Sequence, residues 1–220
     1  MTFNVNLNGK VALITGASSG IGRAVSRAYA QNGCKVYVNY PPAEGENAAS
    51  ALVESIMQAG HSAEMAPADV SQPDQVNSMI SDIINTEGHI DILVNNAGKS
   101  PAIASHEITE RQFDGVVDLN FKGPFRLAAN IGRRMADGEG GVIINISSIA
   151  AVKPVPGVVP YSGAKAALNA MTVSLAHEFG PKVRVNAIQA GPFLTDISKA
   201  WPEEMRRSAP NALGRPGNPE

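Results

Sequence analysis

The stretch "VALITGASSGIG", residues 11–22, decides the fold. Its first five residues are mostly apolar and predict a buried strand, and residues 15–22 form a glycine-rich turn that leads directly into a helix-length segment. Gly16, Gly20 and Gly22 stand where side chains would obstruct a tight strand-to-helix turn and the approach of a pyrophosphate to a helix N-terminus. The stretch therefore predicts the first unit of a dinucleotide-binding fold.

The same turn allows two other interpretations. Its spacing is G-x-x-x-G-x-G and not the commoner G-x-G-x-x-G, so a glycine turn needed only for packing stays open. The segment "GASSG" (16–20) also matches G-x-S-x-G, the nucleophile elbow of serine hydrolases, with Ser18 as the nucleophile. Its position argues against a hydrolase, because such elbows normally follow several strands and no later Asp-then-His pair stands in obvious loops.

Short apolar runs recur along the chain and alternate with helix-length segments. Further apolar runs lie at 35–40, 63–68, 91–95, 141–147 and 183–188, and helical periodicity is found at 21–31, 46–59, 73–87, 107–135 and 161–179. Near-continuous apolar runs are typical of strands that are covered on both faces, as in parallel sheets. The alternation predicts a three-layer α/β fold, a doubly wound, Rossmann-like parallel sheet of six strands in a single domain over residues 1–220.

Composition limits what this domain is expected to bind. The net charge is −2 over 220 residues and the basic residues are scattered, so no nucleic-acid partner is expected. The single cysteine, Cys34, excludes an internal disulfide and a cysteine-rich metal site, and the four histidines lack metal-ligand spacing. The sequence shows no signal-like leader and no membrane-length apolar run, which predicts a cytoplasmic protein without a metal or a membrane partner.

A tyrosine and a lysine four residues apart open the last long helical segment, in "YSGAK" (161–165). Residues at this spacing lie on one face of an α-helix, with Cβ atoms about 5–6 Å apart. An ammonium group beside the phenol would favour phenolate and lower the pKa of Tyr161 from about 10 toward about 7, as a general acid/base requires. A packed tyrosine beside a solvated lysine is the alternative interpretation.

Four motifs together resemble the short-chain dehydrogenase/reductase family in their order and spacing: "TGASSGIG", "NNAG" (95–98), "NISS" (145–148) and "YSGAK". The resemblance covers nearly all of residues 7–220 and is closest to members similar to 3-oxoacyl-(acyl-carrier-protein) reductase. It implies an NAD(P)-dependent oxidoreductase that transfers a hydride between nicotinamide and a carbonyl compound or secondary alcohol. A turn that simply ends a strand is the alternative interpretation of "NNAG".

The resemblance implies four catalytic residues. Tyr161 would protonate the carbonyl oxygen or deprotonate the alcohol, and Lys165 would lower the Tyr161 pKa and hold the ribose hydroxyls. Ser148, thirteen positions before Tyr161, would hydrogen-bond the substrate oxygen, with Ser147 as the alternative. Asn120 in "DLNFKG" would position a water that links Lys165 to solvent, and the alternative is a helix Asn satisfied by the backbone.

The resemblance also implies a cofactor site along the glycine turn and at the ends of later strands. The implied contacts are Gly16, Ser18, Ser19, Gly20, Ile21, Gly22, Asn39, Tyr40, Asp69, Val70, Asn96, Ala97, Gly98, Tyr161, Lys165, Gly191, Phe193 and Thr195. NADP is favoured over NAD, because the second strand ends in Asn39 and Tyr40 without the acid that accepts the 2′-hydroxyl of NAD. Ser18, Ser19 or Asn39 would be able to bond a 2′-phosphate.

The chain departs from the family pattern after the sixth strand. In "QAGPFLTD" Ala190 replaces a proline, while Gly191, Phe193 and Thr195 keep the register that frames the nicotinamide carboxamide. Residues 193–213 resemble the mobile substrate lid. The ending "LGRPGNPE" resembles the point where relatives continue into a helix and a seventh strand, so the sixth strand is expected to be an uncovered edge.

The expected pocket segments, residues 99–104, residues 150–159 and the lid, are mostly apolar. They favour a hydrophobic ketone or secondary alcohol as the substrate, with a 3-oxoacyl thioester or a similar ketone as the best candidate. The family resemblance also implies a homo-oligomer, either a tetramer or a dimer. A nucleotide-binding sensor that keeps the fold without turnover is the alternative that the short ending raises.

Overall fold

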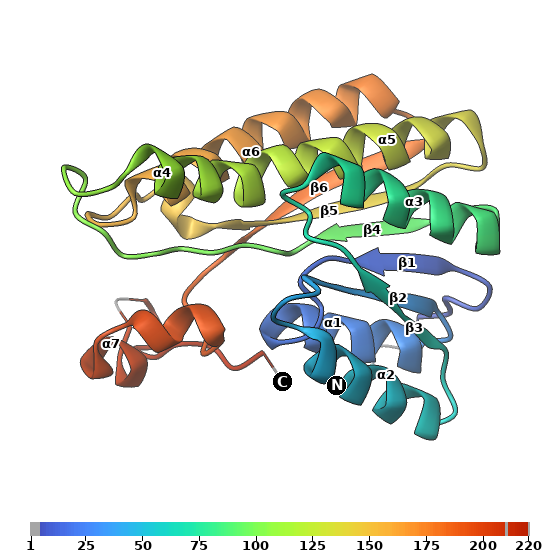
Figure 1. The fold of residues 1–220 in the computed structure, drawn as a ribbon, viewed down its shortest axis with the longest axis horizontal. Coiled ribbons are helices and arrows are strands. Elements are labelled where there is room, and N and C mark those ends of the chain that lie inside the picture. The colour runs from blue at the N-terminus through green and yellow to red at the C-terminus, as the bar shows by residue number, and fades with distance from the viewer. Residues whose placement is uncertain (1–4, 210, 220) are drawn as a thin grey trace.

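The computed structural model describes residues 5–209 and 211–219, and its centre is a six-stranded parallel sheet (Figure 1). The strands are β1 (Val11–Ile14), β2 (Lys35–Tyr40), β3 (Ala63–Pro67), β4 (Ile92–Asn95), β5 (Gly141–Ser148) and β6 (Val183–Ala190). Their order across the sheet is β3-β2-β1-β4-β5-β6, and each neighbouring pair is parallel. This order confirms the predicted doubly wound sheet.

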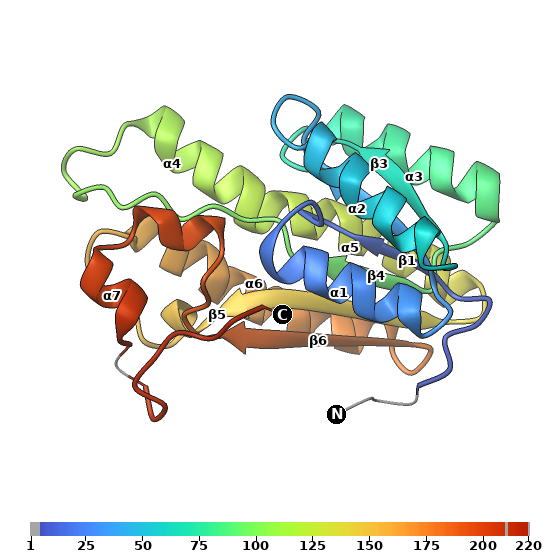
Figure 2. The same cartoon turned by 90° about the horizontal axis from the view of Figure 1, so that it is seen from below.

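Helices cover the sheet in two layers (Figures 1 and 2). They are α1 (Gly20–Gln31), α2 (Glu46–Gln58), α3 (Pro73–Glu87), α4 (Glu110–Val117), α5 (Gly123–Asp137), α6 (Val159–Phe179) and α7 (Glu203–Arg207). The first two helices pack on one face, and α3, α5 and α6 pack on the other. The α1 side stops short of β5 and β6, where Ile144 and Ile146 are only partly buried and Ile188 is 54% exposed.

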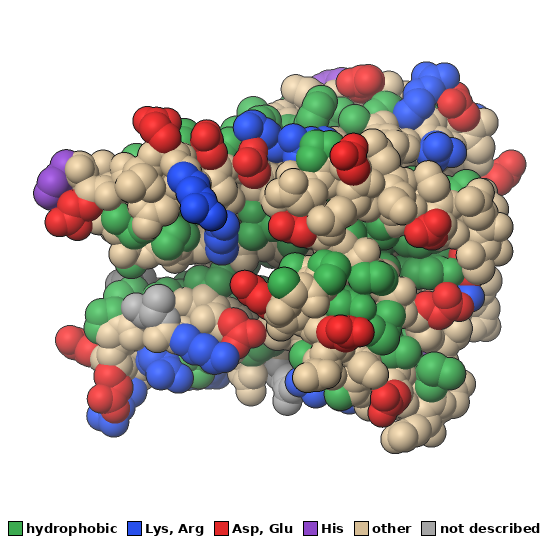
Figure 3. Space-filling view, viewed as in Figure 1, with side chains coloured by type: hydrophobic (Ala, Val, Ile, Leu, Met, Phe, Trp, Pro, Cys, Tyr) green, Lys and Arg blue, Asp and Glu red, His purple; other side chains and the backbone are tan. Residues whose placement is uncertain are grey.

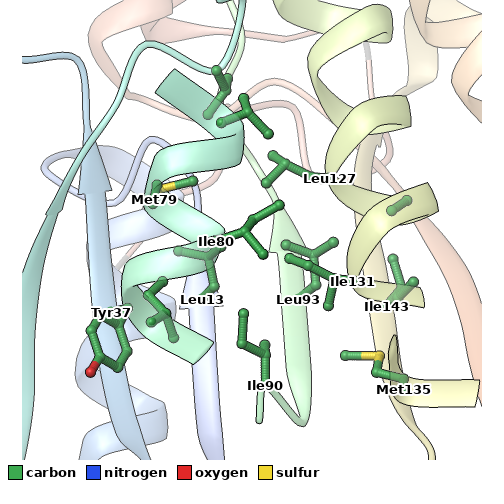
Figure 4. Packing of buried hydrophobic residues seen from close by; sticks show 14 of the residues in the cluster. Leu13, Tyr37, Met79, Ile80, Ile90, Leu93, Leu127, Ile131, Met135 and Ile143 are labelled. Carbon is green, nitrogen blue, oxygen red and sulfur yellow. The ribbon is translucent and has the colours of Figure 1, made fainter. Parts of the chain in front are cut away.

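The larger apolar core lies between the sheet and the layer of α3, α5 and α6 (Figure 4). Leu13 of β1 and Leu93 of β4 are fully buried there, in one cluster with Ile80 of α3 and with Leu127 and Ile131 of α5. Burying one side chain of this size contributes about 1.5–3 kcal/mol. The packing fixes the central strands, so their carboxyl ends form a rigid edge on which a site can be built.

The segment 107–135 does not form the single helix that the sequence predicted. The helix α4 begins only at Glu110, because Thr109 and Gln112 form a capping box there. The next five residues, Asp118–Lys122, form a π-helical turn (η1) that continues into α5. Apolar periodicity misses such a turn, since it carries one extra residue without breaking the buried stripe. Turns of this kind are frequent at functional sites.

The other predicted elements lie within a few residues of the observed ones. The helix α6 begins at Val159, two residues before its predicted start, because Pro160 is accommodated in a first helical turn. The strand β6 continues to Ala190, two residues past its predicted end. Among the described residues none pairs with the outer edge of β6, which is therefore the edge strand that the sequence predicted.

Residues 193–209 leave the sheet after β6, and residues 211–217 return to the starting point of this excursion. They include the 3₁₀ helix η3 (Asp196–Ala200) and the short α7. Phe193 bridges to Gly217, the backbone N–H of Leu194 donates to the Gly217 carbonyl at 2.9 Å, and the Gly217 N–H donates to the Pro192 carbonyl at 2.8 Å. The excursion is therefore held together at its base.

Candidate active site

The carboxyl ends of β1 and β4 lie side by side where the strand order reverses, which is the usual ligand position in open α/β sheets. The glycine turn after β1 packs there on the segment that follows β4. Gly16 has a φ of +59°, and a methyl group added to it would lie 2.8 Å from Cα of Ala97. A methyl group on Gly22 would lie 2.6 Å from Nδ2 of Asn96. Both glycines are required by this close approach of two backbones.

Thr15 joins the two segments, although the sequence interpretation did not single it out. Its buried hydroxyl oxygen accepts the backbone N–H groups of Asn96 at 2.9 Å and Ala97 at 3.0 Å. In return, the Asn96 amide donates to the carbonyls of Thr15 and Gly16 at 2.9 and 3.1 Å. A polar residue directly after an apolar strand is the signal that would have identified Thr15.

Asn39 lies at the end of β2, but its side chain is buried and fully used by the backbone. Its amide group donates to the carbonyls of Ala66 and Ala68, both at 3.0 Å, and its oxygen accepts the Gly16 N–H at 3.3 Å. Asn39 therefore ties β2, β3 and the glycine turn together. This differs from the expectation that Asn39 is able to bond a phosphate, and the neighbouring Tyr40 is buried as well.

The remaining predicted residues of the nucleotide half lie at the same edge. Ser18, Ser19, Gly20 and Ile21 are half-buried around the N-terminus of α1, and Ser19 is its N-cap residue without a side-chain cap bond. The first N–H groups of that helix therefore lack a side-chain cap from Ser19 and suit an anion such as a pyrophosphate.

Asp69 and Val70 follow β3, next to the β2 end. One carboxylate oxygen of Asp69 accepts both the N–H and the hydroxyl of Ser71, at 2.9 and 2.7 Å. Val70 is buried, and its carbonyl abuts the start of α5 at Gly123. These contacts fix the turn on which the adenine pair is expected.

Tyr161, Ser148 and Lys165 come together at the carboxyl end of β5 and the start of α6. A hydrogen bond links the hydroxyl groups of Tyr161 and Ser148, and the Ser148 oxygen also accepts the Ala150 N–H at 3.1 Å. The neighbouring Ser147 is turned away, since its hydroxyl donates to the Lys165 carbonyl at 3.3 Å. The structure thus separates the two serines that the sequence left as alternatives, and brings Ser148 to the tyrosine.

The electrostatics of the Tyr161 and Lys165 pair differ from the prediction. Lys165 Nζ donates to the Ile146 carbonyl at 2.7 Å and lies over the face of the Tyr161 ring, 5.7 Å from its centroid. Burial raises the pKa of Tyr161, and the Ser148 hydroxyl only partly offsets this effect. Burial also lowers the pKa of Lys165 to about 8. The predicted lowering of the Tyr161 pKa is therefore wrong for this structure, because burial of the phenol is the largest effect on its pKa.

Asn120 lies in the π-helical turn and faces Lys165 across a small space. Its amide donates to the carbonyls of Lys99 and Val116, both at 2.9 Å, while its oxygen Oδ1 is buried without a partner among the described residues. A methyl group added to Gly98 would lie 2.7 Å from that oxygen and 3.6 Å from Lys165 Nζ. The unsatisfied acceptor and the ammonium group therefore both lie beside Gly98.

The predicted residues after β6 reach the same edge from the other side. The Thr195 side chain approaches the glycine turn so closely that a methyl group on Gly20 would lie 3.0 Å from its Cγ2. The Phe193 ring covers Gly217, and Gly191 is exposed.

Figure 3 shows the surface hollowed between the lobe that carries α4 and the lobe that carries α7. The cleft gives access to this edge of the sheet.

A buried chain of amides crosses the sheet behind the site and was not predicted. Asn95 of β4 donates to Asn145 of β5 at 2.9 Å, and Asn145 donates to Thr172 of α6 at 2.9 Å. All three side chains are buried. These bonds fix the spacing of β4, β5 and α6, which carry the predicted site residues. Asparagines inside otherwise apolar strands were the available signal.

Metal-binding clusters and membrane-spanning helices are absent from the described residues. Within residues 5–209 and 211–219 no three His, Cys, Asp or Glu side chains gather so that they could hold a metal ion. No helix in this part of the chain is long and apolar enough to cross a membrane.

Comparison with known proteins identifies the family. The model of the short chain dehydrogenase family matches residues 10–206. The chain belongs to the short-chain dehydrogenase/reductase family and is an NAD(P)-dependent oxidoreductase, as the motifs implied. The residues at the switch point fit such a cofactor, since they offer an uncapped helix N-terminus and a glycine turn without obstructing side chains.

Several relatives resemble the chain over most of its length. An uncharacterized oxidoreductase of Methylorubrum extorquens is 39% identical, over 97% of this chain and 87% of its own. Versicolorin reductase of Emericella nidulans is 38% identical over 88% and 73%, and a 3-oxoacyl-[acyl-carrier-protein] reductase of Staphylococcus aureus is 35% identical over 90% and 80%. A crystal structure of a short-chain dehydrogenase/reductase from Mycobacterium marinum superposes with a TM-score of 0.90 at 35% identity, covering 98% and 85% of the two chains. These comparisons give no support to a sensor without turnover or to a serine hydrolase.

Proposed function

We propose that the protein reduces a hydrophobic ketone, or oxidises the matching secondary alcohol, with Tyr161 as the general acid/base. The observation that carries this proposal is the Tyr161 hydroxyl, which is hydrogen-bonded to Ser148 and lies on the same helix face as Lys165, beside the switch point of the sheet. The nicotinamide of a bound cofactor would supply or accept the hydride. The protein's own residues would move the proton and hold the substrate oxygen.

Each catalytic residue has a part that follows from its surroundings. Because burial raises the pKa of Tyr161, the phenol is protonated at neutral pH and can donate to a carbonyl oxygen. Ser148 would donate to the same oxygen and stabilise its developing charge. Lys165 would stabilise the phenolate left behind, and the Asn120 oxygen would hold a water that returns the proton from solvent.

We favour NADP as the cofactor. The end of β2 offers no carboxylate to repel a 2′-phosphate, and Ser18 and Ser19 are the candidate donors that remain because the Asn39 amide donates to backbone carbonyls. Parallel titration with NADPH and NADH tests this preference, and at least ten-fold tighter binding of NADPH is expected. Equal affinities would contradict the preference and leave the reaction type unaffected.

An apolar substrate is supported by exposed apolar side chains in the segments that are expected to form the pocket. Exposed apolar residues recur in the segment after β5 and in the excursion after β6, namely Ile149, Val152, Val155, Val159, Leu194, Met205 and Leu213. The Ile103 N–H donates to the Gly157 carbonyl at 2.9 Å and joins two of the expected pocket segments. A 3-oxoacyl thioester or a similar hydrophobic ketone suits such walls, and residues 193–213 would act as the lid.

The test is an assay of a ketone panel with the wild type and Tyr161→Phe. We expect the variant to lose at least about 100-fold in kcat, since it removes the proton donor, while the Kd of NADPH measured by fluorescence stays within about two-fold. A variant that keeps full turnover would exclude Tyr161 as the acid. A wild type that binds neither cofactor would exclude the whole proposal.

A homo-oligomer, either a dimer or a tetramer, and a cytoplasmic location remain predictions. Exposed aromatic and apolar side chains on the outer helices support self-association, namely Phe113 of α4, Phe125 of α5 and Val173 of α6. Light scattering after size exclusion measures the assembly, and Phe125→Glu is expected to shift it toward the monomer.

A further inference from the structure

The excursion after β6 touches the glycine turn at two adjacent points. The first is the packing of the Thr195 side chain against Gly20. The second is the contact between the next pair of side chains, Ser19 and Asp196: Lys199 and, to a smaller extent, the Ser19 hydroxyl hold the pKa of the Asp196 carboxyl below its usual value. The sequence interpretation assigned no part to Asp196.

Ser19 has the position of a helix cap but does not act as one. Its backbone is extended, with φ −145° and ψ 171°, and its side chain makes no bond to the first turn of α1. A serine at this position usually accepts an N–H from that turn. Here its hydroxyl is turned to Asp196 instead, so the two segments are connected without use of the helix N–H groups that suit a pyrophosphate.

Asp196 is presented on a tight turn and not on an open loop. The N–H and the hydroxyl of Ser198 both donate to the Thr195 carbonyl, at 2.9 and 2.7 Å, and Ser198 is buried. Lys199 pairs with the Asp196 carboxylate at 2.5 Å, which offsets the negative charge beside an anion site. The carboxylate is thus held in place and partly neutralised.

We infer that Asp196 is a positioning residue that fastens the segment 193–213 to the glycine turn through Ser19. This inference rests on the proposed function, because the fastened segment would close over the cofactor's pyrophosphate. A cofactor contacted by both the glycine turn and Thr195 binds more tightly when the two surfaces are joined beforehand, since less ordering is left for the binding step. Breaking the connection should therefore weaken cofactor binding and speed dissociation.

The experiment combines two single variants with their double variant. Ser19→Ala and Asp196→Ala are each expected to raise the Kd of NADPH on the order of five-fold, and the double variant should be no worse than either single one. Asp196→Asn should bind within about two-fold of wild type, because its side-chain oxygen still accepts the Ser19 hydroxyl. Glu203→Ala is the matched control, since it removes the ion pair with Arg207 inside the same excursion but leaves the glycine turn untouched.

Hydrogen exchange in the cofactor-free protein provides a readout that does not depend on catalysis. Peptides covering residues 193–199 should exchange faster in Ser19→Ala and Asp196→Ala and unchanged in Asp196→Asn. The inference is overturned by unchanged exchange, by additive effects of the two substitutions on Kd, or by tighter binding in both Asp196 variants. If the wild type binds no nicotinamide cofactor, the proposed function fails, and the exchange measurement still decides whether the connection exists.

Discussion

Lys165 carries an ammonium group into the interior of the protein. The residue is 4% exposed, and its ammonium group donates a hydrogen bond to the Ile146 carbonyl at 2.7 Å. Burial disfavours the charged form and lowers its pKa from 10.5 to about 8. Below about pH 8 the folded protein must therefore hold a poorly solvated charge. The unfolded chain leaves the same charge in water, so burial of this charge lowers the unfolding free energy.

Lys165→Met should remove the buried charge and with it the pH dependence that Lys165 gives to the unfolding free energy. The folded pKa lies below the unfolded one, so the wild type gains stability as the pH rises from about 8 toward 10.5, and the variant lacks this gain. We expect the difference in unfolding free energy, variant minus wild type, to be about 2–3 kcal/mol larger at about pH 7 than at about pH 10. Urea unfolding at the two pH values measures it, and a difference that does not change with pH would contradict the buried charge.

Two helices of the site contain glycines, and only one of these glycines is required by its surroundings. Gly22 opens α1 against the backbone of Gly16 and the amide of Asn96. Gly163 lies in the helical part of "YSGAK", where nothing stands within 4 Å of an added methyl group. Neither glycine has a positive φ, so the two differ in their surroundings and not in a need for an unusual backbone conformation.

Substituting each glycine by alanine should therefore give opposite results. Gly22→Ala is expected to lower the unfolding free energy by about 1–3 kcal/mol and to weaken NADPH binding, because the turn must move away from the 96–98 segment. Gly163→Ala should raise the unfolding free energy by about 0.5–1 kcal/mol, since alanine stabilises a helix interior. Urea unfolding and cofactor titration of both variants provide the comparison. A Gly22→Ala variant as stable as the wild type would show that the close approach at Gly22 has no energetic effect.

Across the whole molecule the two ends of the sheet carry different kinds of polar group. At the amino end of β2, Lys35 pairs with Glu64 at 2.7 Å and with Glu87 at 2.5 Å, and the Tyr37 hydroxyl donates to Glu87 at 2.7 Å. Lys35 and Tyr37 together hold the pKa of the Glu87 carboxyl below its usual value. The candidate site lies at the opposite, carboxyl end of the strands, so this cluster should contribute to stability alone.

Glu87→Gln should lower the unfolding free energy by about 1–2 kcal/mol at neutral pH, since it removes the charge from a partly buried pair. Because the folded pKa of Glu87 is lowered, the deficit should shrink as the pH falls and the wild-type carboxylate is protonated. The Kd of NADPH should stay within about two-fold of the wild-type value. Glu54→Gln on the exposed side of α2 is the control, with an expected change below about 0.5 kcal/mol. A loss of cofactor affinity in Glu87→Gln would contradict the separation of the two ends.

The sequence by itself determined the strands, the helices and the motifs, because these depend on local periodicity and on glycine positions. The parallel sheet with the glycine turn at its first strand could be predicted, and the fold and family agree with that prediction. The π-helical turn at Asn120 could not, since one extra residue leaves the buried stripe intact.

Only the tertiary structure decided which polar groups face one another. In the folded protein the Asn39 amide donates to backbone carbonyls and the Ser147 hydroxyl donates to the Lys165 carbonyl, away from Tyr161. Asp196 contacts Ser19, which is far from it in the chain. The tertiary structure also set the sign of the Tyr161 pKa change, which spacing on a helix suggested wrongly. The physical reason is that burial and hydrogen-bond partners come from segments distant in sequence, and spacing along one helix does not report how deeply these segments bury a side chain.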